Sequence, residues 1–538
     1  VLIDRKHLNE QFLGQLKNDF GNLMNYSFIA VFIILLIFFR RLELALVSMV
    51  PIVLTGLVTA GAMYLLNLEL NIFSTIVTTL ILGLGIDFSI FMTSGLQQKY
   101  TTGVNQLRTY RTSILLAVIT TVLALGALIF AEHPALKSIS LVSLIGILSA
   151  MIITFVFYPI VFRICIEKRP SKGKSPITLR LFITAILSFF YYGFGGVMYS
   201  ILGMIIVPIL PMKRERKMRV YRKVIAKFLM SVLYSNYGIK NRVKNPHNEK
   251  FEEPAIIIPN HTSFLDTLSM GMIGTEFIFL VNDWVYKSPI FGKAVQMAGY
   301  YPVSKGLEGG EKQLVEFVEK GYSLIIFPEG TRSKSGEIGR FHKGAFHLAK
   351  KYNIDIVHTM EIGKRIKFNE KTDHGDVRSI TRSISADFKN KYQEIRYSLE
   401  DENYFKQKIE LNFLYKTPDV VKLAKKEFKN NKHLYHALNP HIAKKANILR
   451  IGDDLGIWDL MLVLQQTKRK VVSYIENEDY RNVAAQSYLL KSKSIEYKND
   501  FNQKADVLLI TANFVEEKIM KIVAEHSYKE IVVVKNTF

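Results

Sequence analysis

Long apolar segments separated by short polar loops fill the first third of the chain. They occupy roughly residues 25–39, 44–66, 72–95, 113–131 and 137–165. A helix needs about 20 apolar residues to cross a bilayer. The pattern therefore predicts an all-α transmembrane bundle of about five spans over residues 25–166, preceded by an extracytoplasmic segment at 1–24.

The charges of the loops predict an orientation. Basic residues follow the first, third and fifth apolar segments, at Arg40, Arg41, Lys99, Arg108, Arg111, Arg163, Lys168 and Arg169, whereas the loops between carry little positive charge. Lys and Arg favour the cytoplasmic side of a membrane. We therefore expect a multi-pass protein of a bacterial inner membrane, with everything after residue 165 in the cytoplasm.

A further apolar stretch, 181–210, has basic residues on both sides. Both ends therefore favour the cytoplasm, yet about 30 helical residues are too few to cross the hydrocarbon twice. The pattern predicts a re-entrant or interfacial membrane hairpin over residues 180–211, with a bend near Gly193, Gly195 and Gly196. The alternative is a single tilted span, which would place the following residues outside.

After residue 211 the pattern changes to that of soluble α/β domains, with short apolar strand candidates between polar segments. They lie at 255–258, 323–327, 447–451, 470–475, 505–511 and 530–534. The expected architecture is multidomain: the helical membrane bundle, an α/β domain at 212–410, a basic helical linker at 411–445, and a small Rossmann-like α/β domain at 446–538.

Composition narrows the partners. The 538 residues are 49% hydrophobic and 22% charged, with a formal net charge of +23. Such a basic protein attracts either nucleic acid or the anionic inner leaflet, and the apolar spans favour membrane lipids and no nucleic acid. The single cysteine, Cys165, excludes an internal disulfide and a cysteine-ligated zinc site, and we expect no metal. The chain begins at Val1 without an initiator Met, so we expect it to be the C-terminal part of a longer protein.

The third apolar segment contains a carboxylate, in Gly83-Leu84-Gly85-Ile86-Asp87. A charge at membrane depth is costly, so Asp87 is a functional candidate by default. Asp87 could instead lie near a helix end or hold two helices together. The segment resembles the Gly-rich aspartate motif of the RND transporter superfamily, particularly its MMPL branch. This resemblance implies that Asp87 belongs to a proton relay and that another transporter half precedes this chain.

The first α/β domain has a His–Asp pair after its first strand candidate. Residues 260–266 read Asn-His-Thr-Ser-Phe-Leu-Asp. His261 and Asp266 can meet if His261 lies on the strand-to-helix turn and Asp266 lies one turn into the helix. The carboxylate would then fix one imidazole tautomer and leave the other nitrogen to accept a proton from an alcohol. Ser263 and Asp266 also have the spacing of a helix capping box, which is the structural alternative.

A second motif follows the next strand candidate, where residues 327–333 read Phe-Pro-Glu-Gly-Thr-Arg-Ser. Arginine suits fork-like binding of phosphate. The segment 341–344 (Phe-His-Lys-Gly) extends a basic rim, and 299–305 (Gly-Tyr-Tyr-Pro-Val-Ser-Lys) lies between the two motifs. A solvated surface Arg or a structural Gly turn would explain each fragment alone, but their order and spacing together are more specific.

Residues about 215–365 resemble the glycerolipid acyltransferase family of bacterial lysophosphatidate acyltransferases, through a His-x4-Asp motif and the Phe-Pro-Glu-Gly-Thr-Arg-Ser motif. The resemblance implies that His261 is the general base and that Asp266 orients it. It also implies a substrate-binding set of Ser304, Lys305, Glu329, Gly330, Thr331, Arg332 and Lys343, in which Lys305 and Arg332 meet the acceptor phosphate. The family usually has Arg at the position of Lys305 and Val-Pro where this chain has 356–359 (Ile-Val-His-Thr). These departures bear on the identity of the acceptor.

The implied reaction transfers a fatty acyl group from acyl-CoA or acyl carrier protein to the free hydroxyl of 1-acyl-glycerol-3-phosphate, in phospholipid biosynthesis. It requires no metal or other cofactor. Two alternatives remain open. The acceptor could be a specialised lipid or polyene pigment that is subsequently exported, or the chain could be an RND-type lipid transporter with a non-catalytic lipid-binding domain.

The C-terminal domain opens with a strand followed by Gly-Asp-Asp-Leu-Gly at 452–456, and its second strand ends at Glu476 and Asp479. Strand, Gly turn, helix, strand and acid is the layout of a nucleotide-binding α/β unit. The segment resembles the start of a class I methyltransferase, which implies S-adenosylmethionine as a ligand and Gly452, Gly456, Glu476 and Asp479 as its contacts. Asp454 stands where that family has its middle glycine. A degenerate, purely structural domain is the alternative.

Overall fold

The computed structural model describes most of the chain. The described residues are 5–67, 72–235, 244–263, 265–270, 273, 276–302, 307–333, 338–358, 362–368, 375–492, 494–500, 503–511, 523–524 and 528–534. The chain forms two compact units. One combines residues 1–179 with 401–538, and the other comprises 180–400.

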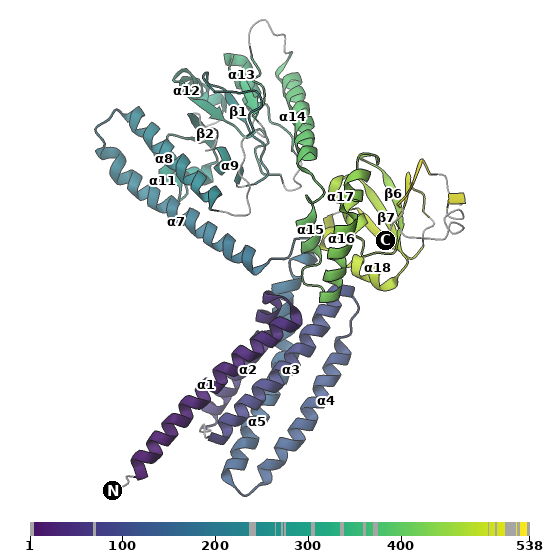
Figure 1. The fold of residues 1–538 in the computed structure, drawn as a ribbon. Helices are drawn as coiled ribbons and strands as arrows, with labels where there is room; N and C mark the ends of the chain where they lie inside the picture. The colour runs from purple at the N-terminus through teal and green to yellow at the C-terminus, as the bar shows by residue number, and fades with distance from the viewer. Residues whose placement is uncertain are drawn as a thin grey trace. The chain divides into compact units, whose positions relative to one another are not determined.

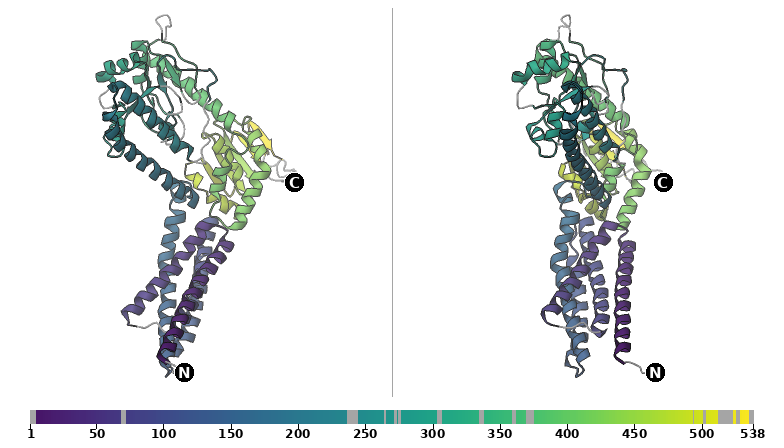
Figure 2. Two further views of the ribbon diagram at one scale, coloured as in Figure 1. Left: turned by 60° about the vertical axis from the view of Figure 1, so that its left-hand side comes forward. Right: turned by 90° about the vertical axis from the view of Figure 1, so that its left-hand side faces the viewer.

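Antiparallel helices that lie side by side form the N-terminal bundle (Figures 1 and 2). They are α1 (Arg5–Phe39), α2 (Leu42–Leu65), α3 (Ile72–Thr102), α4 (Leu107–Gly126) and α5 (Pro134–Ile152), which continues through α6 (Tyr158–Phe162) to Glu167. Helix α5 packs against α2, α3 and α4. The predicted apolar spans are therefore confirmed as helices. Among the described residues, six helices are long and apolar enough to cross a membrane, and the sixth is α7.

Helix α7 (Leu179–Ile209) is one unbroken helix, so the predicted hairpin over 180–211 is wrong. A Cβ atom on Gly195 would lie 2.3 Å from the ring of Phe228, and one on Gly196 would lie 2.3 Å from the ring of Phe291. The two glycines thus admit aromatic rings against the helix instead of bending it. Phe228 belongs to α8 (Arg214–Tyr234), so α7 and α8 pack closely. Elsewhere along its length α7 exposes large apolar side chains, among them Phe189 and Phe194.

A parallel five-stranded sheet forms the centre of the 180–400 unit. Its strands are β1 (Ile256–Ile258), β2 (Phe277–Val281), β3 (Tyr301–Pro302), β4 (Ser323–Ile325) and β5 (Ile356–His358), in the order β3-β2-β4-β1-β5. The helices around it are α9 (Leu265–Ser269), α10 (Asp283–Tyr286), α11 (Gly292–Met297), α12 (Leu307–Glu319), α13 (Gly344–Tyr352) and α14 (Val377–Leu399). Strand β1 pairs directly with β4. Because both run in the same direction, the loops that follow them leave from the same edge of the sheet.

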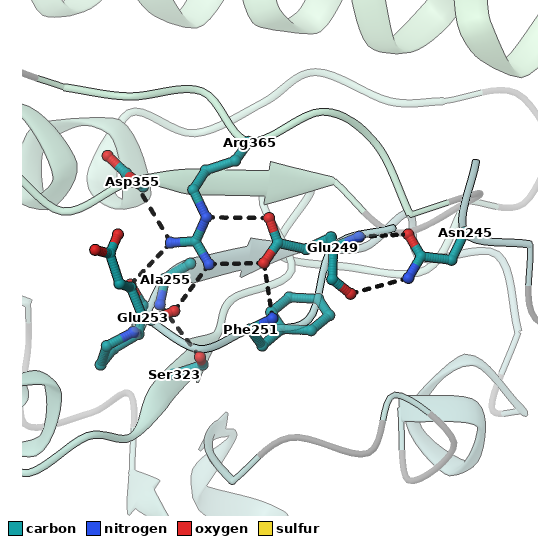
Figure 3. A network of polar contacts seen from close by, with 9 residues as sticks. Asn245, Glu249, Phe251, Glu253, Ala255, Ser323, Asp355 and Arg365 are labelled. Carbon is teal, nitrogen blue, oxygen red and sulfur yellow. Dashed lines mark hydrogen bonds and ion pairs between the residues drawn. The ribbon is translucent and has the colours of Figure 1, made fainter. Parts of the chain in front are cut away.

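A polar network ties the chain entering β1 to β5 (Figure 3). Arg365 binds both carboxylate oxygens of Glu249, at 3.0 and 2.9 Å, and its third nitrogen lies 3.5 Å from Asp355. The guanidinium lowers the pKa of Glu249 below its ordinary value. The side chains of Arg365 and Glu249 are each 12% exposed. This ion-pair network, which the sequence analysis missed, fixes the segment that precedes β1.

A second parallel five-stranded sheet lies in the C-terminal part of the other unit. Its strands are β6 (Asn447–Gly452), β7 (Lys470–Ile475), β8 (Ile495–Lys498), β9 (Val507–Ile510) and β10 (Glu530–Val533), in the order β10-β9-β6-β7-β8. The helices α15 (Lys406–Asn412), α16 (Pro418–Leu438), α17 (Ile457–Gln465) and α18 (Glu478–Ala485) accompany it. Phe428 and Tyr435 of α16 are buried in the same core as β6 and α17. Helix α16, which makes up most of the predicted basic helical linker at 411–445, therefore packs into the C-terminal domain, because one face of this basic helix is apolar.

The bundle and the C-terminal domain are joined by the segment after α15. Tyr415 is buried in the bundle core. The Gln97 side-chain amide on α3 donates to the carbonyl of Lys416, at 3.1 Å, and the Thr417 amide donates to the hydroxyl of Thr101, at 3.0 Å. Lys416 itself is 2% exposed. Its ammonium donates to backbone carbonyls at the end of α18, including Val483 at 2.8 Å.

Lys416→Met should change how stability depends on pH. Burial lowers the pKa of Lys416 to about 7, whereas the pKa of a lysine in an unfolded chain is about 10.4. Between these values the unfolded chain binds the additional proton, so the lysine penalises folding at neutral pH and the penalty fades as pH rises towards about 10. We therefore expect the stability advantage of the variant over the native chain, measured by hydrogen exchange of the α18 amides, to shrink as the pH rises from about 7 to about 10. A constant difference across that range would contradict the buried neutral lysine.

Candidate active site

The first motif lies at the carboxyl end of β1. His261 follows the strand on the turn that enters α9, and Asp266 lies in the first turn of that helix. One oxygen of Asp266 accepts from the amides of Thr262 and Ser263, both at 2.6 Å. The same oxygen lies 3.5 Å from Nδ1 of His261. Asp266 thus closes the turn, as in the capping alternative, and lies beside the ring, but Nδ1 of His261 has no hydrogen-bond partner among the described residues. The orienting role of Asp266 stays a prediction.

The imidazole of His261 packs against the second motif. Its ring lies 4.3 Å from the ring of Phe327, with an angle of 33° between them. The His261 side chain is 18% exposed, so it is neither free on the surface nor sealed in the core. At 3.5 Å the distance to Asp266 is longer than a good hydrogen bond, and catalytic hydrogen bonds often tighten only when substrate is bound.

Glu329 braces the two motifs. One of its carboxylate oxygens accepts from the backbone amide of His261, at 2.8 Å, and the other accepts from Gly339, at 2.7 Å. The residue is 5% exposed. The Ser333 amide also donates to the carbonyl of His261, at 2.7 Å. Both oxygens of Glu329 are thus engaged by the chain's own backbone, a contact that differs from the predicted role at the acceptor.

The predicted phosphate-binding residues lie around the same loop. Gly330 adopts a left-handed conformation with φ of 66°, and a Cβ there would lie 3.2 Å from the imidazole of His342. Thr331, Arg332 and Lys343 are exposed. Lys343 immediately precedes α13. The predicted contacts Ser304 and Lys305 lie outside the described residues.

Asp87 is exposed on the surface of α3, as is Gly83 one turn away. A separate polar cluster, which the sequence analysis missed, is buried inside the bundle. The Ser48 and Thr93 hydroxyls lie 3.0 Å apart, and both lie within hydrogen-bond distance of the Tyr158 hydroxyl. Small polar residues inside apolar segments are the signal that could have revealed it. The relay role of Asp87 stays a prediction.

Charged side chains of the protein itself, Arg450 and Asp454, form an ion pair at the Gly turn after β6. Asp454 accepts from the amide of Gly456, at 2.8 Å, and pairs with Arg450 at 2.7 Å. Arg450 also pairs with Asp459 at 3.1 Å, and both of these side chains are fully buried. The Asp454 carboxylate therefore engages one backbone amide, that of Gly456, which such a turn could otherwise present to a ligand.

The other predicted nucleotide contacts are arranged as follows. Gly452 ends β6, and a Cβ there would lie 2.1 Å from the guanidinium of Arg450. Glu476 and Asp479 are exposed. A cavity of about 630 Å³ lies beside the turn, lined in part by Asp453, Asp454 and Trp458, but none of the four predicted contacts lines it. Within the described ranges, no three His, Cys, Asp or Glu side chains are grouped so that they could hold a metal ion.

Comparison with known proteins identifies two family segments. Residues 240–360 match the acyltransferase family, and residues 14–179 match the MMPL family. The chain therefore carries an acyltransferase-family domain behind an MMPL-like helical segment, as the motifs predicted. The matches do not include the C-terminal sheet.

Curated relatives align with the acyltransferase part. The chain is 33% identical over 176 residues to the chloroplastic 1-acyl-sn-glycerol-3-phosphate acyltransferase BAT2 of Brassica napus, covering 31% of this chain and 51% of the relative. It is 34% identical over 172 residues to the chloroplastic 1-acyl-sn-glycerol-3-phosphate acyltransferase of Arabidopsis thaliana, covering 30% and 48%. The chain thus spans about half the length of these relatives. A crystal structure of the 1-acyl-sn-glycerophosphate acyltransferase from Thermotoga maritima aligns with 16% identity and a TM-score of 0.34, over 40% of this chain and 98% of that one.

Proposed function

We propose that this protein is a membrane-bound acyltransferase that moves a fatty acyl group from acyl-CoA or acyl carrier protein to the free hydroxyl of 1-acyl-glycerol-3-phosphate. One observation carries the proposal: the imidazole of His261 faces Asp266 while its backbone is held by Glu329 of the second motif. The names of the curated relatives support the acceptor class.

The proposed mechanism uses His261 as a general base. The imidazole accepts the hydroxyl proton as the acceptor oxygen attacks the thioester carbonyl, and Asp266 stabilises the resulting imidazolium. When the tetrahedral intermediate collapses, the carbon–sulfur bond breaks and the proton passes from His261 to the leaving thiolate. The products are the ester and the free thiol, so no other reactant is needed.

The exposed cations beside the loop would hold the acceptor. Arg332 and Lys343 flank the turn that Glu329 braces, and a guanidinium can grip a phosphate through two hydrogen bonds. Lys305 would add a third cation in this proposal. An ammonium acts as a point charge rather than a fork, so the hold on the phosphate would depend mainly on Arg332.

The membrane setting is part of the proposal. The apolar exposed face of α7 suits lipid, and the basic loops favour a bacterial inner membrane with both α/β domains in the cytoplasm. The MMPL match over residues 14–179 supports a transporter-like half within this chain, in which Asp87 would belong to a proton relay. It also favours a second candidate function, in which the acceptor is a specialised lipid that is exported after acylation.

The C-terminal domain would be a Rossmann-like unit with a structural role. Its strand order, β10-β9-β6-β7-β8, is that of a doubly wound sheet in which the first strand is central. The ion pair between Arg450 and Asp454 in the Gly turn supports the structural alternative over S-adenosylmethionine binding.

The test is an assay of the full chain in nanodiscs, with radiolabelled acyl-CoA or acyl carrier protein and a panel of acceptors. We expect acyl transfer to 1-acyl-glycerol-3-phosphate, with glycerol 3-phosphate and lysophosphatidylcholine as poorer acceptors. Transfer only to a non-phosphate lipid alcohol would favour the exporter-coupled function. Failure with every acceptor and both donors would contradict an acyltransferase.

Glu329→Gln should lower kcat and leave the KM for the acceptor nearly unchanged. The amide can accept only one of the two backbone hydrogen bonds, and a lost hydrogen bond to a charged group costs about 1.5–3 kcal/mol. His261 would then be less firmly placed while the acceptor contacts persist. If the main effect were instead a higher KM for the acceptor, Glu329 would touch the substrate and would not be a positioning residue.

A further inference from the structure

A cavity of about 460 Å³ lies between α15 and α16. Its floor is apolar and formed by Ile409, Phe413, Val421, Ala424 and Phe428. Four of these five residues are at most 5% exposed. The volume falls within the range of sites that hold small molecules in proteins. The floor could therefore take an aliphatic group out of water.

The rim of this cavity is strongly basic. It carries Lys406, Lys425, Lys429 and Lys432, together with Asn403 and a single carboxylate, Glu410. Lys432 pairs with Glu402 outside the cavity, at 3.3 Å. For the other three lysines, the described part of the chain supplies no carboxylate within ion-pair distance. Clustered positive charge of this kind concentrates anions, so the rim fits an anionic head group.

The cavity belongs to the same compact unit as the membrane-type bundle. The segment that leaves α15 buries Leu414 and Tyr415 in the bundle core. It also binds α3 through Gln97 and Thr101, in the last two turns of that helix. The cavity therefore lies close in sequence and structure to the end of a candidate membrane span. A basic site at such a position meets the anionic head groups of a leaflet.

We propose that this cavity binds an anionic lipid of the phosphatidate type from the membrane surface, with its phosphate among Lys425, Lys429 and Lys432 and the start of an acyl chain on the apolar floor. A free phosphate would engage the basic rim alone and make no contact with the apolar floor. An acidic protein would meet a concave floor between two helices rather than a surface it could cover. None of the lining residues belongs to the unit that carries His261, so the site does not depend on the proposed acyl transfer.

The experiment uses the full chain in phosphatidylcholine nanodiscs that contain a phosphatidate with a photoreactive diazirine in one acyl chain. After irradiation, mass spectrometry of peptides locates the label. We expect labelling of α15 and α16 between residues 405 and 432. Unlabelled phosphatidate should compete, and glycerol 3-phosphate should not. Labelling elsewhere, or full competition by glycerol 3-phosphate, would overturn the proposal.

A pair of matched variants separates this site from general attraction to anionic lipid. K425Q/K429Q/K432Q removes three rim charges, and the label on α15 and α16 should fall about tenfold or more, since each charge near an anionic surface contributes to binding. K422Q/K426Q/K445Q removes three exposed lysines that do not line the cavity, and the label should persist. Equal loss in both variants, or no loss in either, would refute the site.

The two proposals can fail independently. The rim lysines are surface residues, so circular dichroism should show both triple variants folded, and acyl transfer by the first variant should remain measurable. If the first variant failed to fold, the labelling map and the competition in the native chain would still decide the matter. Stronger displacement of the label by acyl carrier protein than by phosphatidate would identify an acidic protein as the partner and overturn the lipid assignment.

Discussion

His261→Ala should reduce acyl transfer by at least about 10²–10⁴-fold, the usual contribution of a positioned general base. In the proposed mechanism the imidazole is the only group that accepts the hydroxyl proton, and the mutation removes it. The backbone amide at position 261 remains and can still donate to Glu329. The turn should therefore persist. The measurement is the initial rate of transfer from labelled acyl-CoA to 1-acyl-glycerol-3-phosphate by the full chain in nanodiscs.

A second histidine in the same domain provides the control. The His347 side chain is 51% exposed on α13 and pairs only with Glu311, at 3.6 Å, among the described residues. His347→Ala should leave the rate within about twofold of the native value, because the half-exposed imidazole takes no part in the proposed mechanism. Circular dichroism and elution volume should match the native chain for both variants. Native rates for purified His261→Ala would remove His261 from the mechanism.

Arg450→Met should destabilise the C-terminal domain by about 3–5 kcal/mol, the usual cost of removing one partner of a buried ion pair. The guanidinium lies between Asp454 and Asp459, and the side chain of Asp459 is fully buried. Burial raises the pKa of Asp459 to about 6 even beside the arginine. Without Arg450 that pKa should rise further. The penalty should then be larger at pH 7 than near pH 5, where Asp459 is protonated in both the native chain and the variant.

Hydrogen exchange can measure this effect locally, because a multidomain membrane protein does not unfold in two states. The amides of β6 should lose protection in Arg450→Met at pH 7 and regain part of it near pH 5. Arg450→Met combined with Asp459→Leu should recover stability, since a buried pair can often be replaced by apolar residues. Lys529→Met, which breaks an exposed pair with Asp506, is the control and should change β6 little. Unchanged protection in Arg450→Met would show that the ion pair contributes nothing to the fold.

Local pattern was sufficient for the elements with strong periodicity. The apolar runs became helices, and all six strand candidates became strands, including β6 and β9. The two motifs of the candidate site were also recognisable, since His261 and Glu329 each follow an apolar strand at a turn. Strands β2, β3, β5 and β8 were not among the candidates. Strand β3 has only two residues, Tyr301 and Pro302, which is too short for an alternating pattern of apolar and polar residues to indicate a strand.

The errors came from residues whose partners are distant in sequence. The local pattern predicts a bend near Gly195 and Gly196, but these glycines instead let the rings of Phe228 and Phe291 approach the helix. The lysines of α16 indicated a linker because the burial of Phe428 depends on a sheet that begins later in the chain. Arg365 was not singled out because its partner Glu249 lies 116 positions away.

The sequence by itself determined which residues carry the candidate chemistry and which segments are apolar enough for a membrane, because both depend on residue type and short spacing. Only the tertiary structure decided that Glu329 holds the backbone of His261 and that Asp454 occupies the Gly turn. The basic cavity between α15 and α16 likewise arises only when two helices pack. A side chain's role is set by the groups within a few ångströms of it, and the chain fold, not the local pattern, brings those groups together.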